Sequence, residues 1–147
     1  MKLVICEKPS VAKSIASALG VTSRADGCFE GNGLIVSWCV GHLVSPMDAA
    51  GYDPAYKKWK YDDLPILPEP FRYVLAKGKE DAFQNLKHLM EREDVTELVN
   101  ACDAGREGEL IFRLVYEMAG CRKPFSRLWI SSMEDAAIRE GFADLRP

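Results

Sequence analysis

The chain has 147 residues, of which 48% are hydrophobic and 28% charged, enough apolar content for one compact globular domain over residues 1–147. Its formal net charge is −3, from 19 Lys and Arg against 22 Asp and Glu. This balance argues against a free-standing protein that coats nucleic acid, because phosphate contacts require an excess of basic residues. No apolar run is long enough to span a membrane.

The N-terminus carries a short apolar stretch, Leu3 to Cys6, which Glu7 ends. A signal peptide needs a longer apolar core and a small-residue cleavage site, so this stretch predicts a strand and a cytoplasmic protein. The five cysteines are an odd number and form no Cys-x-x-Cys pair. We therefore expect reduced, mostly buried thiols instead of disulfides or a zinc site.

The predicted elements alternate between apolar runs typical of strands and segments with apolar residues at helical spacing. We expect strands at 2–6, 34–40, 71–75, 97–102 and 127–130, and helices at 10–19, 79–92, 107–119 and 134–142. Gly20 and Gly120 are the expected stops of two helices. Strands that alternate with helices indicate an α/β fold with a mainly parallel sheet. The proline-rich stretch 41–70 is too long for a simple connection, which suggests a functional role.

Two acidic residues come directly after strands, Glu7 after the first and Asp103 after strand 97–102. In open α/β sheets, ligands bind beyond the carboxyl ends of the strands. If these two strands are neighbours, both carboxylates face one crevice. Gly105 and Gly108 then permit a tight turn that brings Glu107 toward the same point.

Carboxylates that crowd together repel one another unless a proton or a cation holds them. Hard oxygen ligands suit Mg²⁺, which takes one or two carboxylates together with phosphate oxygens. The alternative is structural, because acidic residues such as Glu107 and Glu109 also complement the dipole of a helix N-terminus. A Walker phosphate loop is excluded, because no Gly-x-x-x-x-Gly-Lys occurs.

Five collinear segments resemble type IA DNA topoisomerases of the bacterial topoisomerase III type. They are Glu7-Lys8-Pro9-Ser10, Ser37 to Leu43, Leu64-Pro65-Ile66, Asp103 to Ile111, and Arg127 to Met133. The resemblance implies a Toprim fold, a Rossmann-like, mainly parallel sheet with helices on both faces, and an Asp-x-Asp-x-Glu motif that binds Mg²⁺. Gly105 replaces the second Asp of that motif, which leaves open whether Glu109 or Glu7 compensates.

The resemblance also implies a reaction, in which a tyrosine cleaves one DNA strand, another strand passes, and the break is resealed. Glu7 would be the catalytic acid or base and Lys8 would stabilise charge on the phosphate. Asp103 and Glu107, with Glu7, would hold Mg²⁺. The partner would be DNA with single-stranded segments, bound mainly through domains that this chain lacks, and we expect a monomer.

Three further residues are candidate phosphate contacts with equally ordinary alternatives. Arg106 either contacts phosphate or pairs with Glu109 at i, i+3. Arg127 is either a phosphate ligand or part of a structural ion pair. His42 lies near the DNA path or is a hydrogen-bonded structural histidine.

The nucleophilic tyrosine of type IA enzymes is expected beyond Pro147, because none of the five tyrosines matches its motif. This chain alone is therefore predicted not to relax DNA. Two rival hypotheses remain. A Toprim nuclease or primase-like domain would use metal ions alone, and a non-catalytic module would dock onto a partner through the stretch 41–70.

Overall fold

The computed structural model describes residues 1–25, 27–39, 44–46, 73–75 and 78–147. A six-stranded sheet, in the order β2-β3-β4-β1-β7-β8, forms its centre. The bounds are β1 Lys2–Cys6, β2 Ser23–Ala25, β3 Cys28–Gly31, β4 Leu34–Trp38, β7 Glu97–Ala101 and β8 Phe125–Arg127. Strands β4, β1, β7 and β8 are parallel, whereas β2 and β3 pair antiparallel at the other edge. The predicted α/β, mainly parallel sheet is confirmed.

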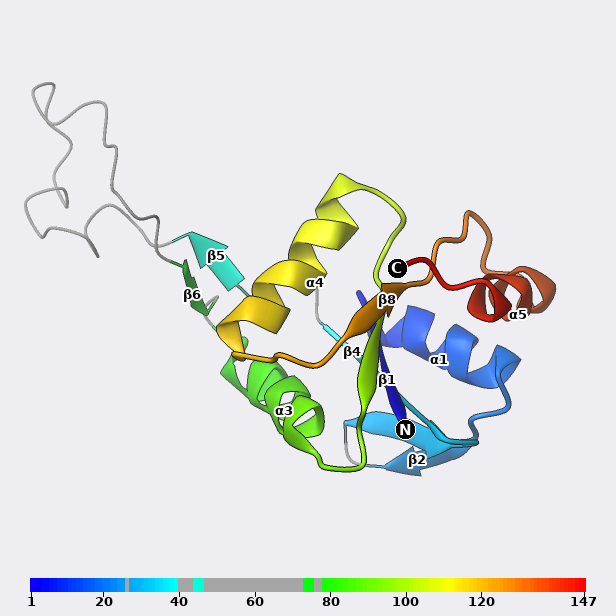
Figure 1. Cartoon of the computed structure of the whole chain (residues 1–147), viewed down its shortest axis with the longest axis horizontal. Helices are drawn as coiled ribbons and strands as arrows, with labels where there is room; N and C mark the ends of the chain where they lie inside the picture. The colour runs from blue at the N-terminus through cyan, green and yellow to red at the C-terminus, as the bar shows by residue number, and fades with distance from the viewer. Residues whose placement is uncertain (26, 40–43, 47–72, 76–77) are drawn as a thin grey trace, which may run out of the picture.

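Helices cover both faces of this sheet (Figure 1). They are α1 Pro9–Ala18, α3 Glu80–Glu91, α4 Arg106–Met118 and α5 Asp135–Ala143. Helices α3 and α4 pack on one face over a core that includes Leu86, Leu98 and Phe112. Helices α1 and α5 pack on the other over a second core that includes Ile15 and Ile138. Among the described residues, no helix is long and apolar enough to cross a membrane.

The central strand β1 is buried from Leu3 to Cys6, because it has a strand on each side and helices above and below. Its neighbours run in matched register, with Cys6 opposite Trp38 in β4 and opposite Ala101 in β7. Three parallel strands therefore end at the same edge of the sheet. The residues that follow them are Glu7, Cys39 and Cys102-Asp103.

Most predicted elements lie where the hydrophobic pattern placed them, within one or two residues at each end. The predicted strand 127–130 is wrong, because the strand ends at Arg127 and the next residues leave the sheet. The short strands β2, β3 and β5 (Val44–Pro46) were not predicted. The end of predicted strand 71–75 is present as β6, Tyr73–Leu75, which pairs with β5 outside the main sheet.

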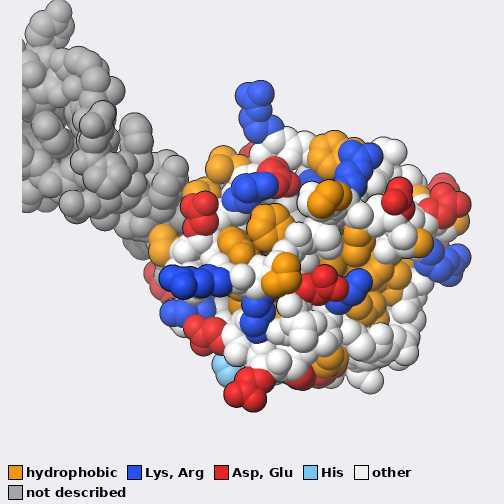
Figure 2. Space-filling model, viewed as in Figure 1, with side chains coloured by type: hydrophobic (Ala, Val, Ile, Leu, Met, Phe, Trp, Pro, Cys, Tyr) orange, Lys and Arg blue, Asp and Glu red, His pale blue; other side chains and the backbone are white. Residues whose placement is uncertain are grey.

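The predicted thiol state is confirmed, since all five cysteines are described, none is in a disulfide, and only Cys121 is not fully buried. On the face shown in Figure 2, basic and acidic side chains intermingle between apolar ones, in keeping with the net charge of −3. Apart from residues 44–46, the stretch 41–70, including His42, lies outside the described residues.

Candidate functional site

The carboxylates of Glu7 and Asp103 lie together at the carboxyl edge of the sheet. Their strands β1 and β7 are direct parallel neighbours, which confirms the premise of the predicted crevice. Oxygen Oε2 of Glu7 is buried and accepts no hydrogen bond from the described residues. The pKa of Glu7 is raised above its ordinary value, first by burial and then by the adjacent Asp103 carboxylate. The main chain of Asp103 also hydrogen-bonds Glu7 and lowers this pKa, but only in part. Two carboxyl groups thus lie side by side, and a proton or a cation would relieve their repulsion.

Lys8 supplies the positive charge nearest in sequence to this pair. It is exposed at the N-cap position of α1, in extended conformation, and Pro9 follows as the first helical residue. Proline is favoured there because its missing N–H would have no partner in the helix. The charge of Lys8 opposes the rise in the pKa of Glu7, so the ammonium group acts on the same carboxyl.

The turn from Asp103 to α4 depends on two glycines. Gly105 has a φ of 156° and a ψ of 177°, a backbone conformation nearly restricted to glycine. A Cβ atom at Gly108 would overlap the carbonyl oxygen of Asp103 and come within 2.8 Å of its nitrogen. The first turn of α4 therefore packs directly against the main chain of Asp103, and no larger residue fits at position 108.

Glu107 is exposed in the first turn of α4. Within the described part of the chain, no three His, Cys, Asp or Glu side chains lie close enough together to hold a metal ion. The described structure thus brings Glu7 and Asp103 together but does not assemble the predicted set of three carboxylates. The role of Glu107 as a metal ligand stays a prediction.

Both carboxylate oxygens of Glu109 have partners within the chain. Its Oε2 accepts a hydrogen bond of 3.0 Å from Nδ2 of Asn100, and its Oε1 accepts one of 2.7 Å from Nε of Arg113. The i, i+4 partner of Glu109 on the helix is thus Arg113. Arg106 is exposed at the start of α4, and its predicted contact with phosphate stays a prediction.

Arg127 is buried at the end of β8, with 7% of its surface exposed. Its Nη1 donates to the carbonyl oxygen of Asn100 at 3.3 Å, and its Nη2 donates to the carbonyl oxygen of Asp103. Its Nε lies 3.7 Å from Oε2 of Glu109, as the ion-pair alternative requires. Burial lowers the pKa of Arg127. The predicted contact of Arg127 with phosphate stays a prediction.

Sequence reasoning missed Asn100, which is fully buried in β7. Besides its bond to Glu109, its Oδ1 accepts the N–H of Cys102 at 3.1 Å. A signal was present, since Asn100 is the one polar residue in the run Leu98 to Cys102. Because buried polar groups are nearly always hydrogen-bonded, a buried Asn at this position indicates a hydrogen-bond network.

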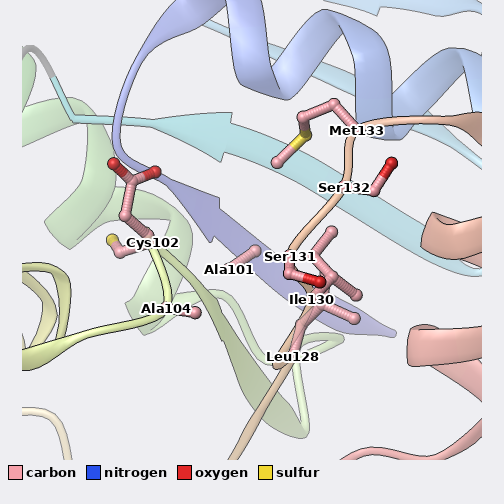
Figure 3. Close-up of a pocket in the computed structure, with 9 residues that line it drawn as sticks. Ala101, Cys102, Ala104, Leu128, Ile130, Ser131, Ser132 and Met133 are labelled. Carbon is pink, nitrogen blue, oxygen red and sulfur yellow. The ribbon is translucent and has the colours of Figure 1, made fainter.

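A cavity of about 350 Å³ opens beside Asp103. The loop that follows β8 forms its opposite wall, with Ser131, Ser132 and Met133 among the lining residues and the Met133 side chain extending toward the end of β7 (Figure 3). The site therefore combines a pair of carboxylates, an exposed cation and a hollow wide enough for part of a ligand.

An open α/β sheet with acidic residues after two adjacent central strands defines a class of domain that binds its ligand beyond the carboxyl ends of those strands. The chain belongs to the Toprim domain family, whose model matches residues 2–133. It is 48% identical over 145 residues to the DNA topoisomerase 3 of Shouchella clausii and 46% identical over 144 residues to that of Bacillus subtilis. These matches cover 99% and 98% of this chain but only 20% of each relative.

A solved structure, the full-length topoisomerase I of Thermotoga maritima, shares the fold. The TM-score is 0.62 at 24% sequence identity, over 98% of this chain and 21% of that one. The chain therefore spans about a fifth of the length of the relatives that it matches.

Proposed function

We propose that this chain is the Toprim domain of a type IA DNA topoisomerase of the topoisomerase III kind. The observation that carries the proposal is the pairing of Glu7 with Asp103 at the ends of adjacent parallel strands. The similarity to two DNA topoisomerases 3 over nearly the whole chain supports it. The proposed substrate is DNA with single-stranded segments, acted on by a cytoplasmic monomer whose tyrosine nucleophile lies outside residues 1–147.

Glu7 is proposed to move the proton. Its raised pKa favours the protonated carboxyl, which can donate a proton to the leaving 3′ oxygen of the cleaved strand. In the reverse step the same group accepts a proton from that hydroxyl. Lys8, exposed beside it, would hold a phosphate oxygen as a point charge.

Asp103 is the proposed metal ligand, together with Glu7 and with Glu107 from the first turn of α4. The buried, unpaired oxygen of Glu7 next to a second carboxylate fits a divalent cation, since hard oxygens are the ligands that Mg²⁺ takes. Bound Mg²⁺ would neutralise phosphate charge and align the broken ends for resealing. Gly105 contributes no side-chain oxygen, so we expect weak binding.

The test is Glu7→Gln in the full-length protein, with cleavage of a single-stranded oligonucleotide as the measurement. Loss of the general acid should lower the cleavage rate by about 10²- to 10⁴-fold. Glu117→Gln makes the same chemical change at an exposed position in the last turn of α4 and should leave the rate unchanged. A Glu7→Gln enzyme that cleaves within twofold of the unaltered enzyme would contradict the proposal.

The 147-residue chain itself provides a second test. It should bind single-stranded DNA weakly and should not relax a supercoiled plasmid. If the purified chain with Mn²⁺ cleaves single-stranded DNA and forms no protein–DNA adduct, the nuclease hypothesis replaces this one.

A further inference from the structure

The guanidinium of Arg127 is directed at main-chain oxygen atoms and not at solvent. With 7% of its surface exposed, it donates to the carbonyl oxygen of Asn100 inside β7 and to that of Asp103 just beyond it. A planar guanidinium can bridge two acceptors at a fixed spacing, which a lysine ammonium group cannot do. Arg127 thus connects the end of β8 with the residue that follows β7.

The side chains of Glu109 and Trp129 lie against the guanidinium of Arg127, and Asn100 holds Glu109. Glu109 Oε2 lies 3.7 Å from Nε of Arg127 and also accepts the hydrogen bond from Asn100. Asn100 in turn accepts the N–H of Cys102, the residue before Asp103. The guanidinium carbon of Arg127 also lies over the ring of Trp129, 5.3 Å from its centroid. The two Nη atoms of the buried cation are thus hydrogen-bonded to main-chain oxygens, whereas its Nε has only the ion pair with Glu109 and no hydrogen bond among the described residues.

The main chain of Asp103 is fixed from the opposite side by Gly108. Because a Cβ at position 108 would overlap the carbonyl oxygen of Asp103, the helix backbone lies in direct contact with that peptide. The same carbonyl oxygen accepts the hydrogen bond from Arg127. The peptide is thus held between a helix and a buried cation, while its side chain stays exposed next to Glu7.

We propose that Arg127 is a positioning residue that fixes the main chain of Asp103 so that its carboxylate is preorganised beside Glu7 for a divalent cation. This inference rests on the proposed function for the identity of the ligand. Residues that orient metal ligands through hydrogen bonds typically change metal affinity by about 10- to 100-fold when they are replaced. We call the hold of Arg127 and Gly108 on the main chain of Asp103 the clamp, and it is present in the chain without metal.

Binding of Mn²⁺ to the 147-residue chain, followed by electron paramagnetic resonance, tests the metal side of the inference. Arg127→Met and Arg127→Lys should each weaken binding by about 10-fold or more, because neither side chain can bridge the two carbonyl oxygens. Arg113→Met is the matched control. It removes the other basic partner of Glu109, from an exposed position, and leaves the bonds of Arg127 in place.

Amide hydrogen exchange of residues 102–108 in the metal-free chain tests the clamp directly. Exchange should be faster in both Arg127 variants and unchanged in Arg113→Met. Circular dichroism at the same temperature shows that each variant is folded. If Arg127→Met fails to fold, Arg127→Lys decides, because it keeps the charge beside Glu109.

Wild-type exchange at residues 102–108 in a folded Arg127 variant would overturn the inference, with or without metal. Recovery of wild-type Mn²⁺ affinity in Arg127→Lys would also overturn it, since charge alone would then suffice. If the unaltered chain binds no Mn²⁺, the proposed metal site fails, and with it the metal part of this inference. Faster exchange would then establish the clamp alone.

Discussion

The two halves of the acidic site are built in different ways. Glu7 and Lys8 are placed by the register of β1 and by Pro9, and the N-terminus of α1 has no side-chain cap. Asp103, by contrast, follows a strand with a buried amide and is tied to Arg127 and Gly108. Glu7 thus follows a strand held by pairing on both sides, whereas Asp103 follows a strand that also carries a polar network.

This difference suggests a division of labour. Glu7, which is proposed to move the proton as well as to contact the metal, follows its strand without such a network. Asp103, which is proposed only to hold the metal, has a main chain fixed by Arg127 and Gly108. Preorganised ligands bind more tightly because less conformational entropy is lost on binding. The comparison can be tested with substitutions that weaken the contacts around Glu7 and those around Asp103 separately.

The largest effect is expected for Gly108→Ala. The added methyl would overlap the carbonyl oxygen of Asp103, so either the helix or the loop must shift. We expect the free energy of unfolding to fall by about 2–3 kcal/mol, as for other overpacked sites. Urea denaturation measures it. Leu110→Ala on the same helix is exposed and should change stability by less than about 0.5 kcal/mol; equal effects of the two changes would show that the contact is not tight.

Replacing Asn100 gives the most direct comparison of β7 with β1, because its partner in register on β1 is the apolar Ile5. Asn100→Leu leaves the buried N–H of Cys102 without its acceptor, which should cost about 1–3 kcal/mol, and it should weaken Mn²⁺ binding as well. Ile5→Val should cost about 0.5–1.5 kcal/mol through lost packing alone. Calorimetric Tm values and Mn²⁺ titrations of both variants give the comparison. Unchanged Mn²⁺ affinity in Asn100→Leu would show that the hydrogen bonds of Asn100 do not contribute to metal binding.

Gly105 tests whether the missing Asp can be restored. Space for a side chain is open there, but the backbone at φ 156° disfavours any residue except glycine. Gly105→Ala and Gly105→Asp should both lose about 1–2 kcal/mol of stability, measured by urea unfolding. If the second carboxylate reaches the cation, the Asp variant will bind Mn²⁺ more tightly than the Ala variant. Equal affinities would place position 105 away from the metal.

The smallest effect concerns pH. Because the pKa of Glu7 is raised on folding, its protonated form favours the folded state. That contribution is present below the ordinary pKa of glutamate and is lost as pH rises through the raised value. Asp103→Asn removes the neighbouring charge, so the pKa of Glu7 should move down toward its ordinary value and this loss should shrink. NMR titration of the Glu7 carboxyl carbon in the metal-free chain measures the shift, and an unchanged pKa would show that burial alone sets it.

Much of this architecture could be predicted because the buried parallel strands are nearly continuous apolar runs and the helices have clear apolar stripes. The neighbouring positions of β1 and β7 were an assumption, but the rule that ligands bind at the carboxyl ends of strands made it useful. The short strands β2 and β3 were missed because three or four residues carry too little periodicity.

The polar network was harder to predict, because it joins residues that are distant in the sequence. Arg127 lies 24 residues from Asp103, and no local pattern reveals that a guanidinium reaches a carbonyl oxygen. The strand that ends at Arg127 was also misplaced, since it was predicted at 127–130 and lies at Phe125–Arg127. Residues 128–130 are apolar or aromatic and read as a strand, but Leu128 and Ile130 pack against α5 instead, where they would contact any side chain at Gly141.

The outer edge of β8 is partly closed by the returning chain. Arg146 and Arg127 exchange two main-chain hydrogen bonds of 2.6 and 2.9 Å, and the Arg146 guanidinium lies over Trp129. An uncovered strand edge is a template onto which a second molecule can add a strand. Since this pair of bonds uses the amide and carbonyl of Arg127 itself, these two groups are not available to pair with a strand of a second molecule.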